Sequence, residues 1–527
     1  MYRVFVADEL APEGLDALAK YNQLDVDFSP GLSIEEAIPH AREADAIIVR
    51  SATKIRGTLL DAAARVKVIG RAGIGVDNID LDATTERGIV VLNTPDANAT
   101  TTAELAIAHM FSLSRNLPAA DRSVRAGKWE RSKFLGNELS GKTVGVIGFG
   151  TIGRLAASRC VGLNMTVLGY DPFVTEQTFT DHGVQKTALD ELLQDSDYVS
   201  LHCPVTEQTK GLINRERLLL MKRGARLINC ARGGLVDEQS LLELVQNRHL
   251  AGAALDVYEN EPPGESALLK EANIHFTPHL GASTQEAQTA VGVEIANQIA
   301  SFLLRGEVTN AVNVPSIAPD KLVKLAPYMD LARRLGQILG IMMSRPLNTI
   351  EVGVFGEASR LDSHPINSSA MVGLLKGHHS VPVNQINALH LARRQGITLT
   401  ETHSTDSKDY ISMVRVSAGS DDEVLSLAGT LFDDRYPRLV RVGDCEVECP
   451  LEGNLLFTRH SDEPGVIGTL GDILGQRGIN ISRMQVGESP DADLAIAVLT
   501  VSHTLSDDTM QEISNMPAVY QALQIAF

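Results

Sequence analysis

The chain has 527 residues, more than one hydrophobic core normally contains, so three or four domains are expected. Its 44% hydrophobic and 21% charged residues are ordinary for a globular protein, and a net charge of −19 argues against binding nucleic acid or an anionic membrane. Five cysteines without framework or zinc-site spacing indicate a reducing compartment. Asp8 and Glu9 interrupt the first apolar run, and no stretch reaches the ~18 apolar residues of a membrane span, so a cytoplasmic protein is expected.

The first 92 residues alternate short apolar segments with helical patterns. Strands are predicted at 3–6, 46–49, 66–69 and 89–92. Alternation of this kind predicts a parallel α/β sheet. A helical pattern then runs from Thr100 to Arg125, and an irregular polar segment leads on to Thr143.

A second α/β series begins at Thr143 and continues to about Pro278. Its predicted strands are 144–147, 166–170, 198–201, 226–229, 253–256 and 275–277. Residues 284–306 are predicted to form a helix, and a proline-containing linker follows it. We expect this helix to return to the first lobe. One lobe would then comprise 1–98 with 284–310, and the other, inserted lobe 99–283.

The sequence changes character beyond Asp320. Apolar residues at helical period occupy 325–343, and mixed strands and helices follow to about Glu448, which predicts an α+β domain at 315–448. Residues 453–527 show strands at 454–458, 479–486, 494–501 and 522–527, with helices at 465–476 and 508–514. This β-α-β-β-α-β order is the split ferredoxin-like arrangement.

A glycine-rich loop follows the first strand of the second series. Gly148, Gly150 and Gly153 form G-x-G-x-x-G between a strand and a helix, which is the context of a dinucleotide-binding fingerprint. Asp171 ends the next strand, where a carboxylate can bond the adenosine ribose and repel a 2′-phosphate, which favours NAD over NADP. The two lobes are therefore expected to be doubly wound parallel sheets, the first flavodoxin-like and the second of Rossmann type.

Three polar residues follow later strands of the same series. Arg232, Glu261 and His279 lie where ligands bind in doubly wound folds, beyond the carboxyl ends of the strands. Oxidation of a 2-hydroxy acid needs a cation for the carboxylate and a base for the hydroxyl proton, and Arg232 and His279 suit these tasks. A glutamate bonded to the far ring nitrogen would fix the histidine tautomer and favour its protonated form.

The segments VIGFGTIG, NCARGG, LDVYENEPP and PHLGAS resemble the D-isomer-specific 2-hydroxyacid dehydrogenases over about residues 1–310. The resemblance assigns catalysis to Arg232, Glu261 and His279, and a dimer interface to 94–140, including Trp129. It also implies that NAD is bound by the three glycines of the loop and by Thr151, Ile152, Asp171, Cys203, Cys230, Ala231, Arg232, Asp256, His279, Gly281 and Ala282.

The first lobe narrows the expected substrate. IVRSATKI and VIGRAGIGVDNID resemble the branch of this family that acts on 3-phosphoglycerate. Cations at strand ends in an acidic protein suit a phosphorylated anion, and the backbone N–H groups of 73–75 could hold a carboxylate. The alternative is ordinary surface cations. Arg131 and Lys133 could reach a cleft, either that of their own chain or that of a neighbouring subunit. The predicted substrate-binding residues are Arg50, Ser51, Lys54, Arg71, Gly73, Ile74 and Gly75.

The C-terminal unit resembles an ACT domain, a module that binds amino acids. His460, Asp462 and Asn480 match its effector-contacting pattern, although such modules sometimes only oligomerise. The domain before it resembles an intervening domain that takes a second anionic effector. His378 and His379 fit a polar loop better than a metal site, and no metal is expected.

Taken together, the resemblance implies oxidation of D-3-phosphoglycerate to 3-phosphooxypyruvate with NAD, the first step of phosphorylated serine biosynthesis. L-serine is the expected feedback effector, and a homodimer or homotetramer the expected assembly. Side activity on 2-oxoglutarate or 2-hydroxyglutarate is a further expectation. Alternatives are another D-2-hydroxy-acid dehydrogenase, acting for example on glyoxylate or hydroxypyruvate, an NAD-sensing regulator, and an amino-acid-binding regulator with a vestigial dehydrogenase.

Overall fold

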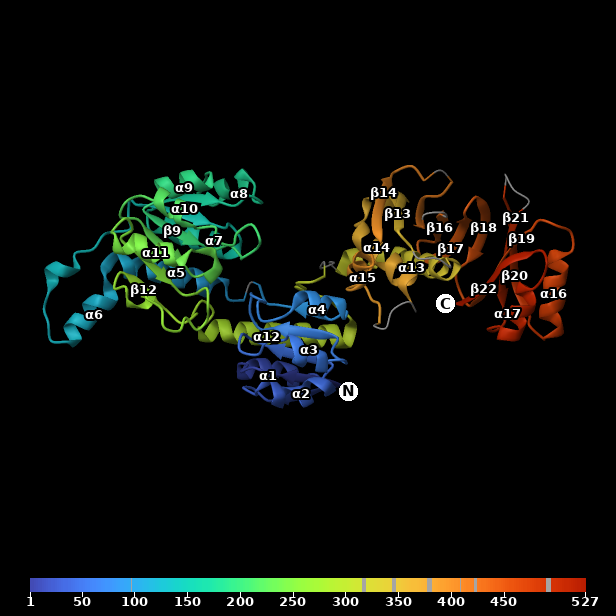
Figure 1. The fold of residues 1–527 in the computed structure, drawn as a ribbon, viewed down its shortest axis with the longest axis horizontal. Coiled ribbons are helices and arrows are strands. Elements are labelled where there is room, and N and C mark those ends of the chain that lie inside the picture. Colours follow the sequence, from blue (N-terminus) through green and yellow to red (C-terminus); the bar gives the residue numbers. More distant parts are fainter. Residues whose placement is uncertain are drawn as a thin grey trace.

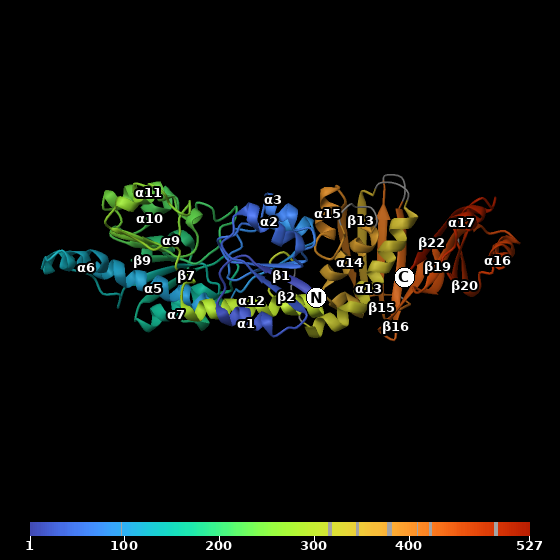
Figure 2. The ribbon, with the colours of Figure 1, turned by 90° about the horizontal axis from the view of Figure 1, so that it is seen from below.

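The computed structural model describes residues 1–95, 97–314, 319–343, 347–376, 382–407, 409–420, 424–489 and 494–527. His378 and His379 lie outside these residues. Four sheets account for the described strands. Figures 1 and 2 show an elongated molecule, with residues 143–276 at one end, the N-terminal lobe next to them, and the sheets of 349–450 and 454–526 toward the other end.

The N-terminal lobe is a five-stranded parallel sheet in the order β2-β1-β3-β4-β5, the flavodoxin-like order expected from the sequence. The strand β2 was not predicted, because it is an edge strand whose aspartates interrupt its apolar pattern. The elements are β1 (Tyr2–Val6), α1 (Pro12–Ala19), β2 (Leu24–Phe28), α2 (Ile34–Glu43), β3 (Ala46–Val49), α3 (Gly57–Ala62), β4 (Val68–Arg71), α4 (Leu81–Glu86) and β5 (Val90–Leu92).

Two helices connect this lobe with the next. The helix α5 (Ala99–Arg115) leaves it, and α12 (Gln285–Arg305) returns to it, as predicted. A Cβ on Gly14 of α1 would meet the carbonyl of Gly292 at 2.9 Å, so a pair of glycines lets α1 and α12 pack closely. The segment after α12 also stays with the lobe, since Ala311 forms a bridge with Leu92.

The second lobe is a seven-stranded parallel sheet in the order β12-β11-β10-β9-β6-β7-β8, the doubly wound Rossmann order with one additional strand. Its elements are β6 (Thr143–Ile147), α7 (Thr151–Gly162), β7 (Thr166–Tyr170), α8 (Glu176–Asp181), β8 (Gln185–Lys186), α9 (Leu189–Asp195), β9 (Tyr198–Leu201), α10 (Arg215–Leu220), β10 (Arg226–Asn229), α11 (Glu238–Gln246), β11 (Gly252–Leu255) and β12 (Ile274–Phe276).

The helical pattern between 100 and 125 is not one helix. It breaks into α5 and α6 (Leu117–Arg125), with Asn116 at φ 52° between them. Asparagine adopts this left-handed conformation more readily than most residues, and Pro118 suits the first turn of the next helix because it needs no N–H partner there. In Figure 1, α6 projects away from the rest of the lobe.

The remaining two sheets share a hydrophobic core. One is mixed, in the order β14-β13-β15-β16-β17-β18, and the other is the antiparallel sheet β20-β21-β19-β22 of the ferredoxin-like unit. Phe457 and Ile525 of the latter pack in the same cluster as Val416 and Leu427 of the former. The elements are α13 (Pro319–Met342), β13 (Thr349–Gly356), α14 (Ser363–Leu375), α15 (Ala388–Arg394), β14 (Thr398–Ser404), β15 (Ser412–Gly419), β16 (Val424–Phe432), β17 (Tyr436–Val442), β18 (Cys445–Pro450), β19 (Asn454–Ser461), α16 (Val466–Gln476), β20 (Ile481–Glu488), β21 (Leu494–Val501), α17 (Asp507–Ser514) and β22 (Val519–Ala526).

The mixed-sheet domain contacts the first lobe at the end of α4. The Nδ2 of Asn384 donates to the Gly88 carbonyl at 2.9 Å, and that of Asn387 to the Glu86 carbonyl at 3.2 Å. Over the residues that the structure describes, no helix has the length and apolar character needed to cross a membrane.

Candidate active site

The glycine loop between β6 and α7 is shaped by close contacts. Gly148 has a φ of 91°, and a Cβ there would meet the backbone of His202 at 2.7 Å. A Cβ on Gly153 would lie 2.0 Å from the Gly148 carbonyl oxygen, so this glycine sets the packing of α7 on the loop. Gly150 is different, since its Cβ would meet nothing within 4 Å. Open space at Gly150 beside the N-terminus of α7 fits the pyrophosphate of a dinucleotide.

Asp171 closes the other side of this loop. Its Oδ2 accepts the N–H of Phe149 and its Oδ1 the N–H of Phe173, each at 2.9 Å. The carboxylate therefore joins the end of β7 to the glycine loop. Each carboxylate oxygen can accept a second hydrogen bond, which leaves capacity for ribose hydroxyls.

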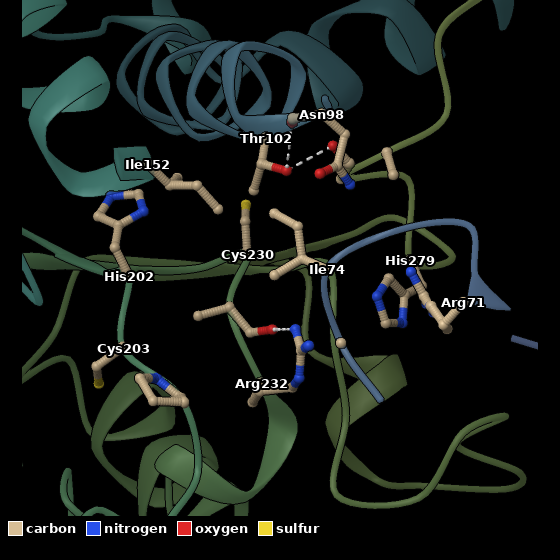
Figure 3. Close-up of a pocket in the computed structure, with 15 residues that line it drawn as sticks. Arg71, Ile74, Asn98, Thr102, Ile152, His202, Cys203, Cys230, Arg232 and His279 are labelled. Carbon is tan, nitrogen blue, oxygen red and sulfur yellow. Dashed lines mark hydrogen bonds between the residues drawn. The ribbon is translucent and has the colours of Figure 1, made fainter. Parts of the chain in front are cut away.

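A cavity of about 330 Å³ lies between the two lobes. In Figure 3, Ile152 and His202 lie on one side of it and Arg71 and His279 on the other. Thr151 is the first residue of α7. The predicted residues that line this cavity are Arg71, Ile74, Gly75, Ile152, Cys203, Cys230, Ala231, Arg232, His279, Gly281 and Ala282.

Asp256 is not among the lining residues of that cavity. It is fully buried at the end of β11, and its carboxylate accepts the Thr277 hydroxyl and the N–H groups of Leu280 and Gly281 at 2.6–2.8 Å. Asp256 thus holds the turn that carries His279, and the backbone N–H of His279 donates to its carbonyl at 2.9 Å.

His279 and Glu261 are in contact. The Nδ1 of His279 lies 2.6 Å from Oε2 of Glu261, whose Oε1 accepts the N–H of Tyr258. Because a carboxylate only accepts, Nδ1 carries the proton and Nε2 is the nitrogen able to take up another. Burial raises the pKa of Glu261, but the hydrogen bond and charge of His279 outweigh it, so the pKa lies below its ordinary value.

Two guanidinium groups lie over the glycine turn after β4. A Cβ on Gly73 would clash with Nη1 of Arg71, and one on Gly75 with Nη2 of Arg232. In this arrangement the two guanidinium groups occupy the space that a Cβ at either position would fill, a role for these glycines that the sequence did not show. Burial, together with the positive charges of Arg232 and Arg50, lowers the pKa of Arg71 to about 10. Three cations converge here, which favours an anionic ligand.

A second cavity of about 450 Å³ adjoins the first, and Arg71, Gly75, Arg232, His279 and Ala282 line both. The other predicted residues that line it are Arg50, Ser51, Lys54 and Glu261.

Two residues that sequence reasoning missed support the loop after β3. The carboxylate of Asp8, at the end of β1, accepts the N–H groups of Arg50 and Thr53 and the Thr53 hydroxyl. The Nδ2 of Asn78 donates to the carbonyls of Arg50 and Thr53. Asp8 is a strand-end carboxylate at the point where the sheet order reverses, a signal that could have found it.

Asn98, Thr102 and His202 also line the first cavity and were not predicted. Burial lowers the pKa of His202 to about 4, so this imidazole is neutral near pH 7. Burial raises the pKa of Cys203 to about 11, which keeps its thiol protonated. The walls near α7 therefore carry little charge, in contrast to the arginine-rich side.

The three predicted effector residues differ in their exposure. His460 is 2% exposed and its Nδ1 contacts the Ser461 carbonyl, whereas Asp462 and Asn480 are exposed. Arg131 and Lys133 are exposed and line neither interlobe cavity. Within the described ranges, no group of three His, Cys, Asp or Glu side chains is placed to hold a metal ion.

The arrangement combines a dinucleotide-binding loop, a carboxylate-backed histidine and a cluster of arginines at one cleft. A histidine with this partner can accept a hydroxyl proton, and a guanidinium beside it can hold a carboxylate and the neighbouring oxygen. The chemistry that fits is oxidation of an anionic 2-hydroxy acid or the reverse reduction.

Comparison with family models gives three matches. Residues 107–281 match the NAD-binding domain of D-isomer specific 2-hydroxyacid dehydrogenases, residues 324–443 the D-3-phosphoglycerate dehydrogenase intervening domain, and residues 454–518 the ACT domain.

Similar curated proteins span the whole chain. Proteins named D-3-phosphoglycerate dehydrogenase from Synechocystis sp. and Archaeoglobus fulgidus are each 39% identical, the first covering 100% of this chain and 95% of its own, the second 99% of each. Among solved structures, a glyoxylate reductase from Paecilomyes thermophila (31% identity, TM-score 0.54) and D-lactate dehydrogenase from Escherichia coli (29%, 0.52) each cover 59% of this chain and 98–99% of their own. The chain therefore belongs to the D-3-phosphoglycerate dehydrogenase family of D-isomer-specific 2-hydroxyacid dehydrogenases and is an NAD-dependent oxidoreductase.

Proposed function

We propose that the protein oxidises D-3-phosphoglycerate to 3-phosphooxypyruvate with NAD, the first step of phosphorylated serine biosynthesis. The observation that carries the proposal is the convergence of Arg50, Arg71 and Arg232 on a cavity that also contains the His279–Glu261 pair. The carboxylate and the phosphate of such a substrate would neutralise the positive charge of these three arginines. The names of the full-length relatives support the same substrate.

The cations divide between the two anionic groups. Arg232 holds the carboxylate and the hydroxyl oxygen, because it is the arginine that lines both cavities from the lobe that also carries His279. Arg50, Lys54 and Arg71, with Ser51, hold the phosphate from the first lobe. The turn at Gly73, Ile74 and Gly75 contributes backbone and the space for the arginines.

His279 accepts the hydroxyl proton on Nε2 as the substrate carbon is oxidised. Glu261 keeps Nδ1 protonated and stabilises the imidazolium that forms, since it remains a carboxylate at neutral pH. When bound, NAD would supply the acceptor for the hydride that leaves this carbon, that is, its hydrogen with two electrons. Arg232 stabilises the charge on the oxygen while the carbonyl forms.

The cofactor is held by the loop at Gly148, Gly150 and Gly153 with Thr151 and Ile152. Asp171 bonds the ribose and disfavours NADP. Asp256 acts through the turn at Gly281, and the rest of the pocket is formed by Cys203, Cys230, Ala231 and Ala282.

L-serine is the proposed effector. It would bind through the exposed Asp462 and Asn480 of the ACT domain together with the buried His460. A homodimer or homotetramer is proposed because Trp129 and Leu135, near the projecting α6, are 79% and 89% exposed. In such an assembly Arg131 and Lys133 would lie close to a neighbour. The domain limits given by the sequence, and a cytoplasmic location, stay predictions.

The test is NAD reduction by the purified full-length protein with D-3-phosphoglycerate, with and without L-serine. D-lactate, D-glycerate and 2-hydroxyglutarate are compared at matched concentrations. Turnover fastest with the phosphorylated acid and slowed by L-serine supports the proposal. Faster turnover of an unphosphorylated acid would show that the proposed substrate is wrong. Activity that does not change with L-serine would show that the proposed effector is wrong.

A further inference from the structure

The carboxylate of Asp77 lines the substrate cavity, although the proposed substrate is an anion. Among its described lining residues, Arg50, Lys54, Arg56, Arg71 and Arg232 are cations, while Asp77 and Glu261 are acids. An acid in a cavity for an anion repels the ligand, so its presence needs a structural reason. Glu261 has one, because it bonds His279.

Asp77 is hydrogen-bonded to Arg232, the other residue that the proposed mechanism places at the reacting atoms. Its Oδ2 accepts the Nε–H of Arg232 at 3.0 Å. The two residues are 155 positions apart in sequence and belong to different lobes, so this contact crosses the cleft. Each acid of the cavity is thus hydrogen-bonded to one of the two groups that the proposed chemistry needs.

One further hydrogen bond holds the guanidinium plane, and Gly75 leaves room for it. The Nη1 of Arg232 donates to the Ala231 carbonyl at 2.7 Å, and Nη2 lies over Gly75, where a Cβ would come within 1.9 Å of it. With Nε bound to Asp77 and Nη1 to Ala231, the plane has two anchors and its remaining N–H donors are left for a ligand. A long arginine side chain without such anchors samples several rotamers.

We propose that Asp77 is a positioning residue, which reaches across from the first lobe to orient the Arg232 guanidinium toward the hydroxy acid. The inference rests on the proposed role of Arg232 in binding that acid. Asp77 is 77% exposed and Arg232 30%, so their ion pair adds little to stability. The consequence of losing it lies in the kinetic constants.

The sign of the change in KM separates positioning from simple electrostatics. If Asp77 only reduces the positive charge of the cleft, Asp77→Asn strengthens binding of the anion and lowers KM. If Asp77 orients Arg232, the same variant raises KM and lowers kcat despite the extra positive charge. We expect kcat/KM to fall about tenfold in Asp77→Asn and more in Asp77→Ala, because the amide oxygen still accepts a hydrogen bond.

The experiment measures kcat and KM for the acid, NADH binding by fluorescence, and thermal unfolding. Asp82→Asn is the matched control, since it removes the same charge from the exposed first turn of α4 and lines neither cavity. Arg232→Lys lacks the Nε–H, so adding Asp77→Asn to it should cost no further activity. A lower KM in Asp77→Asn, or independent effects in the double variant, would overturn the inference.

Wild-type activity keeps the two hypotheses apart. If D-3-phosphoglycerate is inert but another 2-hydroxy acid is oxidised, the proposed substrate is wrong and the Asp77 series is run with that acid. If wild type is active and Asp77→Asn matches Asp82→Asn in both constants, Asp77 has no positioning role.

Discussion

Two alanine substitutions in the glycine loop should impair the protein in different ways. Gly150→Ala adds a methyl group where the structure has open space, and Gly153→Ala adds one 2.0 Å from the Gly148 carbonyl oxygen. The two glycines are three residues apart in the same motif. Both variants make the same glycine-to-alanine change, so any difference in their stability or NADH affinity comes from the contacts at each position.

Gly150→Ala should fold at least as well as wild type. The φ of Gly150 is −71°, which alanine adopts without strain. The change should therefore leave stability unchanged or raise it by ~0.4–1 kcal/mol, because alanine reduces the conformational entropy of the unfolded chain. The methyl group would, however, occupy the space assigned to the cofactor. Overpacking of this kind costs about 1–3 kcal/mol, which corresponds to roughly 5-fold to 150-fold weaker NADH binding.

Gly153→Ala should lower stability as well as binding. The methyl group meets backbone, not a mobile side chain, so α7 must move by more than about 1 Å to accept it. A loss of about 1–3 kcal/mol is expected. Thermal unfolding and NADH fluorescence titration measure both effects. Unchanged NADH affinity in Gly150→Ala would refute the cofactor site, and a fully stable Gly153→Ala would refute the packing argument.

Three further predictions concern the rest of the site. His279→Gln should lower kcat by about 10²-fold to 10⁴-fold, measured as NADH formation, and a loss below tenfold would contradict its role as base. Asp256→Ala leaves three donors of the 277–281 turn without an acceptor and should cost about 3 kcal/mol or more in the free energy of unfolding, measured by denaturant titration; an unchanged midpoint would argue against this role. His202 has a pKa of about 4 when folded against 6.5 in the unfolded chain, so unfolding takes up a proton between these values. Its contribution to stability is complete above pH 6.5 and should fall by up to about 1.4 kcal/mol per pH unit toward pH 4. His202→Gln should lose this slope, and parallel curves for the two proteins would be evidence against it.

The sequence was most informative where structure is local. The strands 166–170, 198–201 and 226–229 were predicted with the bounds that the structure has, because each is a short apolar run between turns. The glycine loop was identified for the same reason, since strand, turn and helix follow each other directly. The edge strand β2 was missed because its aspartates interrupt the apolar run, and the break at Asn116 was missed because the helical pattern resumes directly after it.

Roles that depend on two lobes meeting could not be predicted. Arg232, Glu261 and His279 were identified as candidates, and the structure brings Glu261 and His279 into contact. The partner of Arg232 is Asp77, which lies in the other lobe, and nothing in the sequence specifies how the lobes are oriented. Asp256 was expected at the cofactor, but its three hydrogen bonds show that it organises the turn before α12.

The C-terminal half of the molecule contacts the first lobe beside α4. The ACT sheet and the domain before it share a hydrophobic core and therefore pack as one body. That pair contacts the first lobe through Asn384, Asn387 and an ion pair between Arg394 and Glu86, all at the end of α4. Figure 1 shows the nucleotide lobe on the far side of this contact. Because α4 begins four residues after Asp77, this contact and the carboxylate that holds Arg232 belong to the same short segment of the first lobe.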